Sequence, residues 1–382
     1  MTRHVEIAGG GIGGLYVATV FARQGWSARV HERSPEIREI GAGIYIKNNS
    51  IEVLDEFGIF DPLVAHGVKL DRALHINRKQ QVFQNRKLAG QSRVHVFPRQ
   101  AVIDALRVAA EKAGVDIVTN STVAGADPAG ALLLEDGRRL PADLVIGADG
   151  AWSKVRESLG VGGTCRKLPT IINRYLIPSR EITPDLVTRE YWSGRYRIGI
   201  TPSGPDTTYV YQVSPEWDKA ATALPMDLAL WTRAFPMLQR ELEMMRKCDA
   251  SQYNYAIVDC PRWQKGRVAL IGDAAHGLPP TLGQGAGLTL MNARALAAVV
   301  QQGGPVENAL PEWEQAVRFI SDKTQRWAMR YDFFTRQWPT ALWFVRPAIT
   351  WAFRSIPALN YRMRIADRGL RESTVGRLIH AD

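Results

Sequence analysis

In three stretches of the chain, glycines follow a short apolar run. Two of these stretches also contain aspartate. The three stretches span Gly9–Gly14, Gly147–Arg156 and Arg267–Gly287. Each apolar run has the length of a buried strand, so in a parallel sheet all three stretches would lie at the carboxyl ends of strands. Those ends form the crevice where such sheets bind ligands. The pattern therefore predicts one crevice for a long cofactor, in which one glycine turn holds a pyrophosphate.

The first stretch carries a GxGxxG pattern, formed by Gly9, Gly11 and Gly14. Its flanks predict a strand, a helix and a second strand, over His4–Ala8, Leu15–Gln24 and Ala28–Glu32. The glycines allow a tight turn and a close approach of backbone to phosphate, and the helix N-terminus offers N–H groups to its charge. Glu32 ends the second strand and can accept hydrogen bonds from ribose hydroxyls. A glycine turn without a ligand is the alternative.

Composition narrows the class of protein. A chain of 382 residues is too long for one small core, which predicts two domains. An apolar content of 46% and a charged content of 23% are typical of a globular protein. The net charge of +10 is spread along the chain without a nucleic-acid-reading module, so we expect no nucleic-acid partner. A basic surface would attract anionic substrates and cofactors.

The expected location is the cytoplasm. A first strand at residue 4 leaves no room for a signal peptide, and three widely separated cysteines predict neither a disulfide framework nor a metal site. We expect no integral membrane segment, because no apolar run is long enough. The tryptophan-rich stretch Ala341–Val345 with Ala348–Phe353 is interpreted as a core helix or a homodimer contact, with a membrane-surface helix as the alternative.

The predicted fold class is α/β, a Rossmann-like nucleotide-binding domain with an inserted antiparallel-sheet substrate domain and C-terminal helices. The substrate domain is expected where the sequence changes to aromatic strands punctuated by proline. The predicted boundaries are residues 1–70, 96–165 and 264–335 for the nucleotide domain, 71–95 and 166–263 for the substrate domain, and 336–382 for the C-terminal helical segment. Further helices are expected over Ser50–Phe57, Arg99–Ala113, Met226–Met245, Ala286–Gln302 and Pro311–Phe334.

Together the GxGxxG, Asp149-Gly150 and Gly272-Asp273 motifs resemble those of the single-component aromatic flavoprotein monooxygenases, the p-hydroxybenzoate hydroxylase family. The resemblance covers essentially the whole chain and implies FAD as cofactor and NADH or NADPH as co-substrate. It implies that Asp273 binds the ribityl hydroxyls and that Pro280 lies beside the flavin ring. The residues that it assigns to the cofactor are Gly9, Gly11, Ile12, Gly13, Gly14, Glu32, Arg33, Arg99, Asp149, Gly150, Arg156, Gly272, Asp273, Pro280, Gly283, Gly285, Ala286 and Gly287.

Three positions depart from the family pattern. Gly287 stands where asparagine is common, Asn292 where aspartate is common, and Asn48 where proline is usual. The first two changes leave backbone contacts to the flavin intact. Asn48 puts the loop beside the flavin in doubt.

Within that family, Gly41–Tyr45 and Gly272–Gly287 are most similar to the branch that acts on hydroxylated pyridine carboxylates, such as 2-methyl-3-hydroxypyridine-5-carboxylate oxygenase. That similarity implies a pocket for a small aromatic substrate lined by Arg174, Arg197, Tyr209 and Tyr255. A guanidinium holds a carboxylate through two parallel bonds, and a tyrosine offers a ring face and a hydroxyl. Arg197, Tyr209 and Pro280 are therefore the expected positioning residues; a surface arginine and core tyrosines are the alternatives.

The resemblance implies that O2 hydroxylates the ring through a flavin C4a-hydroperoxide, with ring opening as a variant of the reaction. The alternatives are a hydroxybenzoate or salicylate hydroxylase, and a flavin oxidase or epoxidase on the same scaffold. A non-enzymatic nucleotide-binding protein is a further rival. His75 and His276 are more readily explained by packing or loop orientation than by acid–base work, and the seven histidines have no metal-binding spacing.

Overall fold

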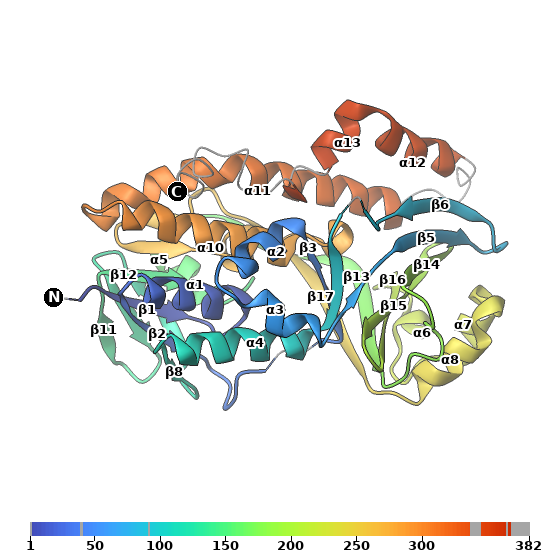
Figure 1. Ribbon diagram of the computed structural model, residues 1–382, viewed down its shortest axis with the longest axis horizontal. Coiled ribbons are helices and arrows are strands. Elements are labelled where there is room, and N and C mark those ends of the chain that lie inside the picture. Colours follow the sequence, from blue (N-terminus) through green and yellow to red (C-terminus); the bar gives the residue numbers. More distant parts are fainter. Residues whose placement is uncertain (1, 39–40, 91, 337–344, 364–365, 368–382) are drawn as a thin grey trace.

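Two large sheets organise the chain (Figure 1). The computed structural model describes residues 2–38, 41–90, 92–336, 345–363 and 366–367. The central sheet has the order β18-β19-β12-β1-β2-β8, and all its pairs are parallel except β18 with β19. Its strands span, in that order, Gln264–Lys265, Val268–Leu270, Leu144–Gly147, His4–Ala8, Ser27–His31 and Asp116–Val118. The mixed α/β class that the sequence predicts is confirmed.

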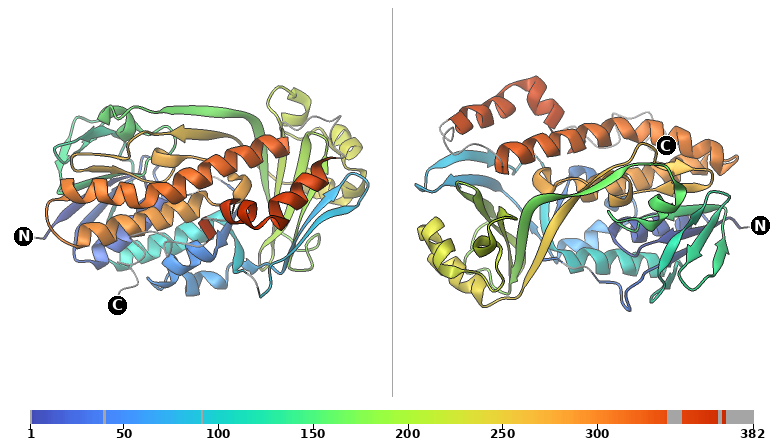
Figure 2. Two further views of the ribbon diagram at one scale, coloured as in Figure 1. Left: turned by 90° about the horizontal axis from the view of Figure 1, so that it is seen from above. Right: turned by 180° about the vertical axis from the view of Figure 1, so that it is seen from behind.

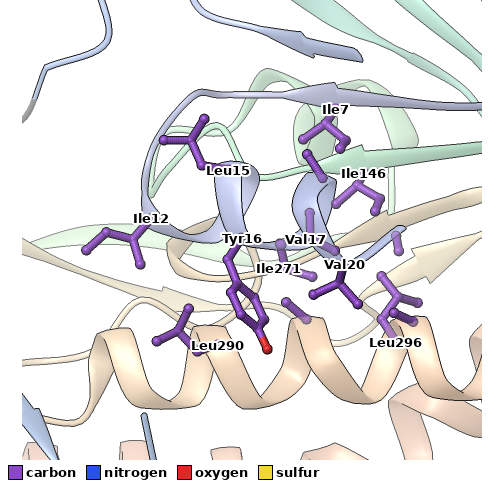
Figure 3. Packing of buried hydrophobic residues seen from close by; sticks show 14 of the residues in the cluster. Ile7, Ile12, Leu15, Tyr16, Val17, Val20, Ile146, Ile271, Leu290 and Leu296 are labelled. Atoms are coloured by element: carbon purple, nitrogen blue, oxygen red, sulfur yellow. The ribbon is translucent and has the colours of Figure 1, made fainter. Parts of the chain in front are cut away.

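Four long helices pack with this sheet and with one another. Helix α1 (Ile12–Arg23) contacts α4 (Arg99–Lys112) and α10 (Gly285–Gln301), and α10 contacts α11 (Val306–Arg336). Figure 3 shows Tyr16 of α1 beside Leu290 of α10, with strand residues such as Ile146 on the other side of α1. These side chains are fully buried, because α1 is enclosed by strands and by other helices. The shorter helices nearby are α2 (Asn48–Asp55), α3 (Phe60–Val64), α5 (Lys154–Leu159) and α9 (Asp273–His276).

The second sheet has seven strands in the order β17-β13-β16-β15-β14-β5-β6. They span, in that order, Ala250–Asp259, Thr164–Ile177, Thr207–Pro215, Tyr196–Gly204, Val187–Ser193, Arg72–Asn77 and Val82–Lys87. Only β14 and β5 pair in parallel. Two small antiparallel sheets complete the fold, β11-β10-β9 (Arg139–Pro141, Ala131–Leu134, Val123–Asp127) and β3-β7-β4 (Gly43–Lys47, Val94–Pro98, Val68–Lys69).

One face of the seven-stranded sheet is covered by short helices instead of the single helix expected over Met226–Met245. The insert forms α6 (Lys219–Thr222), α7 (Leu228–Ala234), a 3-10 turn η1 (Pro236–Leu238) and α8 (Gln239–Arg246). Pro236 causes the break, because its ring removes a backbone donor and clashes with the preceding turn. Trp231 and Phe235 stack beside this break, with ring centroids 5.9 Å apart, and are fully buried.

A small hydroxyl cluster joins the two parts of the fold. The Tyr45 hydroxyl on β3 lies 2.7 Å from the Thr201 hydroxyl on β15 and 3.1 Å from that of Thr188 on β14. The two threonine hydroxyls lie 2.6 Å apart. These bonds fix the inner face of the seven-stranded sheet relative to the chain that follows the first glycine motif.

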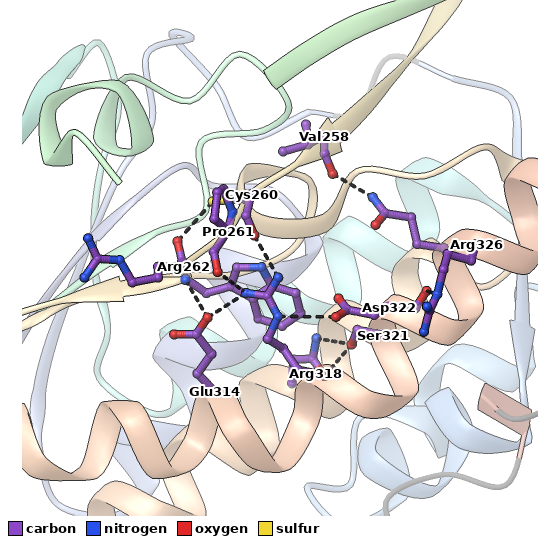
Figure 4. A network of polar contacts seen from close by, with 12 residues as sticks. Val258, Cys260, Pro261, Arg262, Glu314, Arg318, Ser321, Asp322 and Arg326 are labelled. Carbon is purple, nitrogen blue, oxygen red and sulfur yellow. Dashed lines mark hydrogen bonds and ion pairs between the residues drawn. The ribbon is translucent and has the colours of Figure 1, made fainter. Parts of the chain in front are cut away.

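A polar network holds α11 against the chain that leaves β17 (Figure 4). Arg318 donates to the carbonyls of Pro261 at 2.7 Å and Cys260 at 3.0 Å, and to Glu314 Oε1 at 2.7 Å. The guanidinium also lies 5.0 Å from the ring centroid of Trp263. Helix α11 begins at Val306 instead of the expected Pro311, which lies inside the helix.

The chain after α11 returns over the second sheet. Helices α12 (Arg346–Ser355) and α13 (Pro357–Met363) lie beside β6 and α11, as Figures 1 and 2 show. Residues 341–344 of the tryptophan-rich stretch lie outside the described residues. Among the described residues, none of the helices has the length and apolar character needed to cross a bilayer.

Candidate active site

The glycine turn after β1 has the geometry that its motif predicts. Gly9 has φ +99°, and a Cβ at Gly14 would lie 1.9 Å from the Gly9 carbonyl oxygen, so only glycine fits there. A Cβ at Gly11 would meet no protein atom within 4 Å, which leaves that face open to a ligand. Helix α1 begins at Ile12, earlier than the expected Leu15, because Gly13 and Gly14 form its first turn. Its free N–H groups therefore point at the open face.

Glu32 lies at the end of β2, beside this turn. Its carboxylate accepts hydrogen bonds from the backbone N–H of Gly10 and of Ser34, both at 2.9 Å. The predicted ribose-binding acid thus also fixes the glycine turn. Arg33 follows it and is exposed.

Two side chains of the second motif have structural roles, although Gly150 of the same motif lines the cavity. Asp149 accepts from the N–H groups of Lys154 and Val155, at 2.8 and 3.1 Å, and so caps α5. Arg156 donates to the carbonyls of Ala274 and Ala151, both at 2.7 Å. Arg156 therefore has a structural role, in which both arms of its buried guanidinium bind backbone carbonyls.

A cavity of about 550 Å³ extends from the glycine turn to the inner face of the seven-stranded sheet. It is lined by most of the predicted cofactor residues, namely Gly11, Ile12, Gly13, Arg99, Gly150, Gly272, Asp273, Pro280, Gly283, Gly285 and Ala286. Gly287 instead faces α2, where a Cβ would lie 2.6 Å from Asn49 Nδ2. All four predicted substrate residues, Arg174, Arg197, Tyr209 and Tyr255, line the cavity on the sheet side.

The sequence reasoning missed several polar residues of the cavity. Lys47 Nζ donates to the Leu282 carbonyl at 2.5 Å, and Asn49 Nδ2 donates to Gln284 Oε1 at 3.0 Å. Lys47 and Gln284 both line the cavity, at the loop near the end of the third stretch. Gln284 lies inside a recognised motif and could have been named, whereas Glu190 and Tyr211 gave no local signal.

Arg174 is the cation at the centre of the substrate side. It donates to the Tyr255 hydroxyl, and its guanidinium lies 5.1 and 5.3 Å from the ring centroids of Tyr253 and Tyr255. It is 9% exposed, and its Nε has no hydrogen-bond partner among the described residues. No carboxylate of the described chain pairs with it. Because arginine stays charged in proteins, this position favours an anionic ligand.

Tyr209 lies beside Arg174 as a protonated phenol. Burial raises the pKa of Tyr209, and the opposing effect of Arg174 does not cancel the shift. Its ring leaves room only for glycine at position 43, where a Cβ would come within 2.4 Å of it. Tyr209 can therefore offer a ring face and a hydroxyl donor to a bound ring.

Arg197, the expected carboxylate clamp, pairs with a carboxylate of the protein itself. Its Nη1 lies 3.1 Å from Glu190 Oε1, and its guanidinium lies 5.6 Å from the Trp192 ring centroid. The residue is 6% exposed. The protein itself supplies a carboxylate for Arg197, whereas Arg174 has no carboxylate partner among the described residues.

The two histidines singled out from the sequence occupy different surroundings. His276 is fully buried, its Nε2 lies 2.9 Å from Asn292 Nδ2, and burial lowers its pKa to about 4. It is a neutral packing group between α9 and α10. His75 lines the cavity and stacks on Trp192, with ring centroids 5.5 Å apart.

These residues fit FAD. The open face of Gly11 lies at a helix N-terminus, which suits a pyrophosphate. Asp273 lines the same cavity at the carboxyl end of β19, where a carboxylate can accept from hydroxyl groups. The cavity is continuous from this turn to Arg174, so a ring placed beyond the ribityl chain would meet the substrate side.

Comparison with known proteins identifies the class that this fold and site define. The FAD binding domain family matches residues 2–305. The chain belongs to this family, and it is an FAD-dependent monooxygenase of the aromatic hydroxylase type.

Its relatives act on different rings. It is 36% identical to a 2-heptyl-3-hydroxy-4(1H)-quinolone synthase of Mycobacteroides abscessus over 341 residues, which is 86% of this chain and 89% of the relative. It is 28% identical to 3-hydroxybenzoate 6-hydroxylase 1 of Aquipseudomonas alcaligenes over 335 residues, 83% and 85% of the two chains. The structure of 2-methyl-3-hydroxypyridine-5-carboxylic acid oxygenase superposes with a TM-score of 0.85, 31% identity and 96% coverage of both chains.

Proposed function

We propose that the protein uses NADH or NADPH and O2 to hydroxylate an acidic nitrogen-containing aromatic ring, in the first place a hydroxylated pyridine carboxylate. One oxygen atom enters the ring and the other leaves as water, while the nicotinamide loses a hydride. The bound flavin would supply the electron transfer and the oxygen activation. The observation that carries the proposal is Arg174, a buried cation that lines the cavity and has no carboxylate partner within the described ranges.

The residues of the chain would orient and desolvate the ring. Arg174 would hold a ring oxygen or a carboxylate, and Tyr255 and Tyr209 would donate hydrogen bonds around it. Pro280, at the start of the turn η2 (Pro280–Leu282), would present its carbonyl on the flavin side. Burial of this cluster would keep water from the reacting ring.

A second ring, a 4-quinolone with an alkyl arm, is favoured by one feature of the cavity. Leu70, Leu74, Leu88 and Val94 line it and form an apolar wall near β5 and β6. The name of the quinolone synthase relative gives its product a heptyl group. An apolar arm would gain about 0.8 kcal/mol per buried methylene on such a wall.

The test is a turnover screen of the FAD-loaded protein with NADH and NADPH. Hydroxypyridine carboxylates, hydroxybenzoates and 2-alkyl-4-quinolones are supplied in turn. Mass spectrometry of the products then measures how many oxygen atoms were added. A gain of one oxygen atom from a nitrogen heterocycle is expected, and a gain of two would mean that the ring is opened. Reduction of O2 to hydrogen peroxide with every ring would contradict the proposal and indicate an oxidase.

A further inference from the structure

One transverse row of the seven-stranded sheet crosses six strands, and five of its six positions carry polar side chains. Paired positions connect Arg174 on β13, Tyr211 on β16, Gly199 on β15, Glu190 on β14 and His75 on β5. The row ends at Gln84 on β6, which pairs with His75. All of these residues except Gly199 line the cavity. The sheet face above the cavity therefore has two polar ends, one at Arg174 and one at Glu190, His75 and Gln84.

Tyr211 separates these two ends. A Cβ at Gly199 would lie 2.1 Å from atoms of the Tyr211 ring, so the ring lies directly over the β15 backbone. Burial raises the pKa of Tyr211 far above its usual range, and nearby Glu190 adds to the shift. Tyr211 is thus a neutral, fixed divider between the end that carries Arg174 and the end that carries Glu190.

The second end is a connected group of four side chains. Glu190 Oε1 pairs with Arg197 Nη1 at 3.1 Å, and Glu190 Oε2 lies 3.6 Å from His75 Nε2. Gln84 Nε2 lies 3.3 Å from the same nitrogen of His75. We call Arg197, Glu190, His75 and Gln84 the distal cluster.

The distal cluster contains buried polar atoms that lack the hydrogen-bond partners that burial demands. In the described part of the chain, Arg197 Nε and Gln84 Oε1 have no hydrogen-bond partner. Their residues are 6% and 8% exposed, and both line the cavity. Buried polar atoms are nearly always hydrogen-bonded in native proteins. One unused donor and one unused acceptor beside the same cavity therefore indicate a ligand that offers an acceptor and a donor.

The charge of the distal cluster decides which ligand group it takes. Arg197 already has a carboxylate, Glu190, so a second carboxylate would meet a paired cation and a negative neighbour. An uncharged group with a carbonyl and an N–H satisfies Arg197 Nε and Gln84 Oε1 without adding charge. Strands β13 and β15 lie two spacings, or about 10 Å, apart. A molecule that reaches both ends is therefore longer than a single six-membered ring.

We propose that the distal cluster is a second substrate subsite, which binds a carboxamide or cyclic amide while Arg174 holds the acidic oxygen of the ring. The proposal rests on the proposed function and deepens it. It assigns the protein a substrate class with two polar ends, either a fused bicyclic ring or a ring with an amide arm.

The test measures binding to the oxidised, FAD-loaded protein by the change in flavin absorbance. The probes are 4-hydroxyquinoline, its 2-carboxamide and its 2-carboxylate. We expect the carboxamide to bind about tenfold tighter than the parent ring. We expect the carboxylate to gain nothing. Equal dissociation constants for the carboxamide and the parent, tighter binding of the carboxylate, or no binding of any probe would each overturn the subsite.

Variants locate the effect. Gln84→Leu should bring the carboxamide to the affinity that the parent ring has in the same variant. Asn85→Leu, on the exposed face of the same strand, is the matched control and should keep the full gain. Replacing the ion pair as a unit, with Glu190→Gln and Arg197→Met together, avoids an unpaired buried charge and should also remove the gain. A gain that survives both Gln84→Leu and the double substitution would refute the assignment.

The turnover screen separates failure of the subsite from failure of the proposed function. If oxygen enters a simple hydroxypyridine or quinolone ring while the carboxamide has no advantage, only the subsite is wrong. If no nitrogen heterocycle gains oxygen, the proposed function fails whatever the probes bind.

Discussion

At the scale of single residues, the two arginines of the substrate side differ in their partners. Arg197 shares a buried ion pair with Glu190, whereas Arg174 is surrounded by tyrosines. Removing one member of a buried pair leaves the other charge uncompensated, so Arg197→Met should mainly destabilise the fold. Arg174→Met leaves no such charge behind. The two substitutions therefore separate folding from binding.

We predict that Arg174→Met weakens the binding of a hydroxypyridine carboxylate by about 2–4 kcal/mol, because a buried charge-assisted contact is lost. The measurement is a titration of the FAD-loaded protein followed by flavin absorbance. Thermal unfolding should show a melting temperature that is unchanged or higher, since an unpaired buried cation is removed. Arg166→Met on the exposed part of the same strand is the control. An unchanged dissociation constant for Arg174→Met would remove Arg174 from the substrate site.

At the scale of elements, the glycine turn carries two glycines with different demands. Gly14 is enclosed by the backbone of Gly9, whereas the space beside Gly11 is empty of protein atoms. An added methyl group should therefore affect cofactor binding at Gly11 and folding stability at Gly14.

We predict that Gly11→Ala folds normally and loses affinity for FAD, because the added methyl occupies the face offered to the pyrophosphate. Gly14→Ala should instead lower the stability of the FAD-free protein, because its Cβ would overlap a carbonyl oxygen at 1.9 Å. Circular dichroism melts of both FAD-free variants, together with FAD titration of Gly11→Ala, check this. Equal melting temperatures for the two variants would contradict the packing argument.

Elements with a local signal were the ones that the sequence predicted well. The strand over His4–Ala8 has the bounds expected from its apolar run, and the Gly272-Asp273 motif lines the cavity as its place after a strand requires. Strand β13 runs over Thr164–Ile177, and its length is set by pairing with β16 and β17. No local pattern contains that pairing.

Strand pairing also determined which contacts of the site could not be predicted from the sequence. Glu190 could not be matched with Arg197 from the sequence, since β14 and β15 bring the two together only through their register. The sequence therefore predicted that Arg197 lies in the cavity wall but not that it pairs with Glu190. The structural role of Arg156 was hidden for the same reason, because one of its carbonyl partners, Ala274, belongs to a distant part of the chain.

At the scale of the whole molecule, two buried histidines link stability to pH. Burial is the main cause that lowers the pKa of His276 and of His95 to about 4, and Lys69 and Arg93 add to the shift of His95. His276 joins α9 to α10 near the cavity, and His95 lies in the small sheet between β3 and β4. Both must be neutral in the folded protein, so protonation opposes folding in two separate parts of the molecule.

We predict that the free energy of unfolding has its full value above pH 6.5 and falls as the pH is lowered toward 4. Below pH 6.5 these two histidines bind protons in the unfolded chain but not in the folded protein, where they are buried. Each therefore lowers the free energy of unfolding by up to about 3 kcal/mol near pH 4. Urea unfolding at several pH values between 7.5 and 4.5 measures the slope. His276→Gln, which keeps an acceptor for Asn292 but cannot titrate, should flatten it, whereas His66→Gln on the surface should not. Parallel slopes for the wild type and His276→Gln would show that His276 is not the group that couples folding to pH.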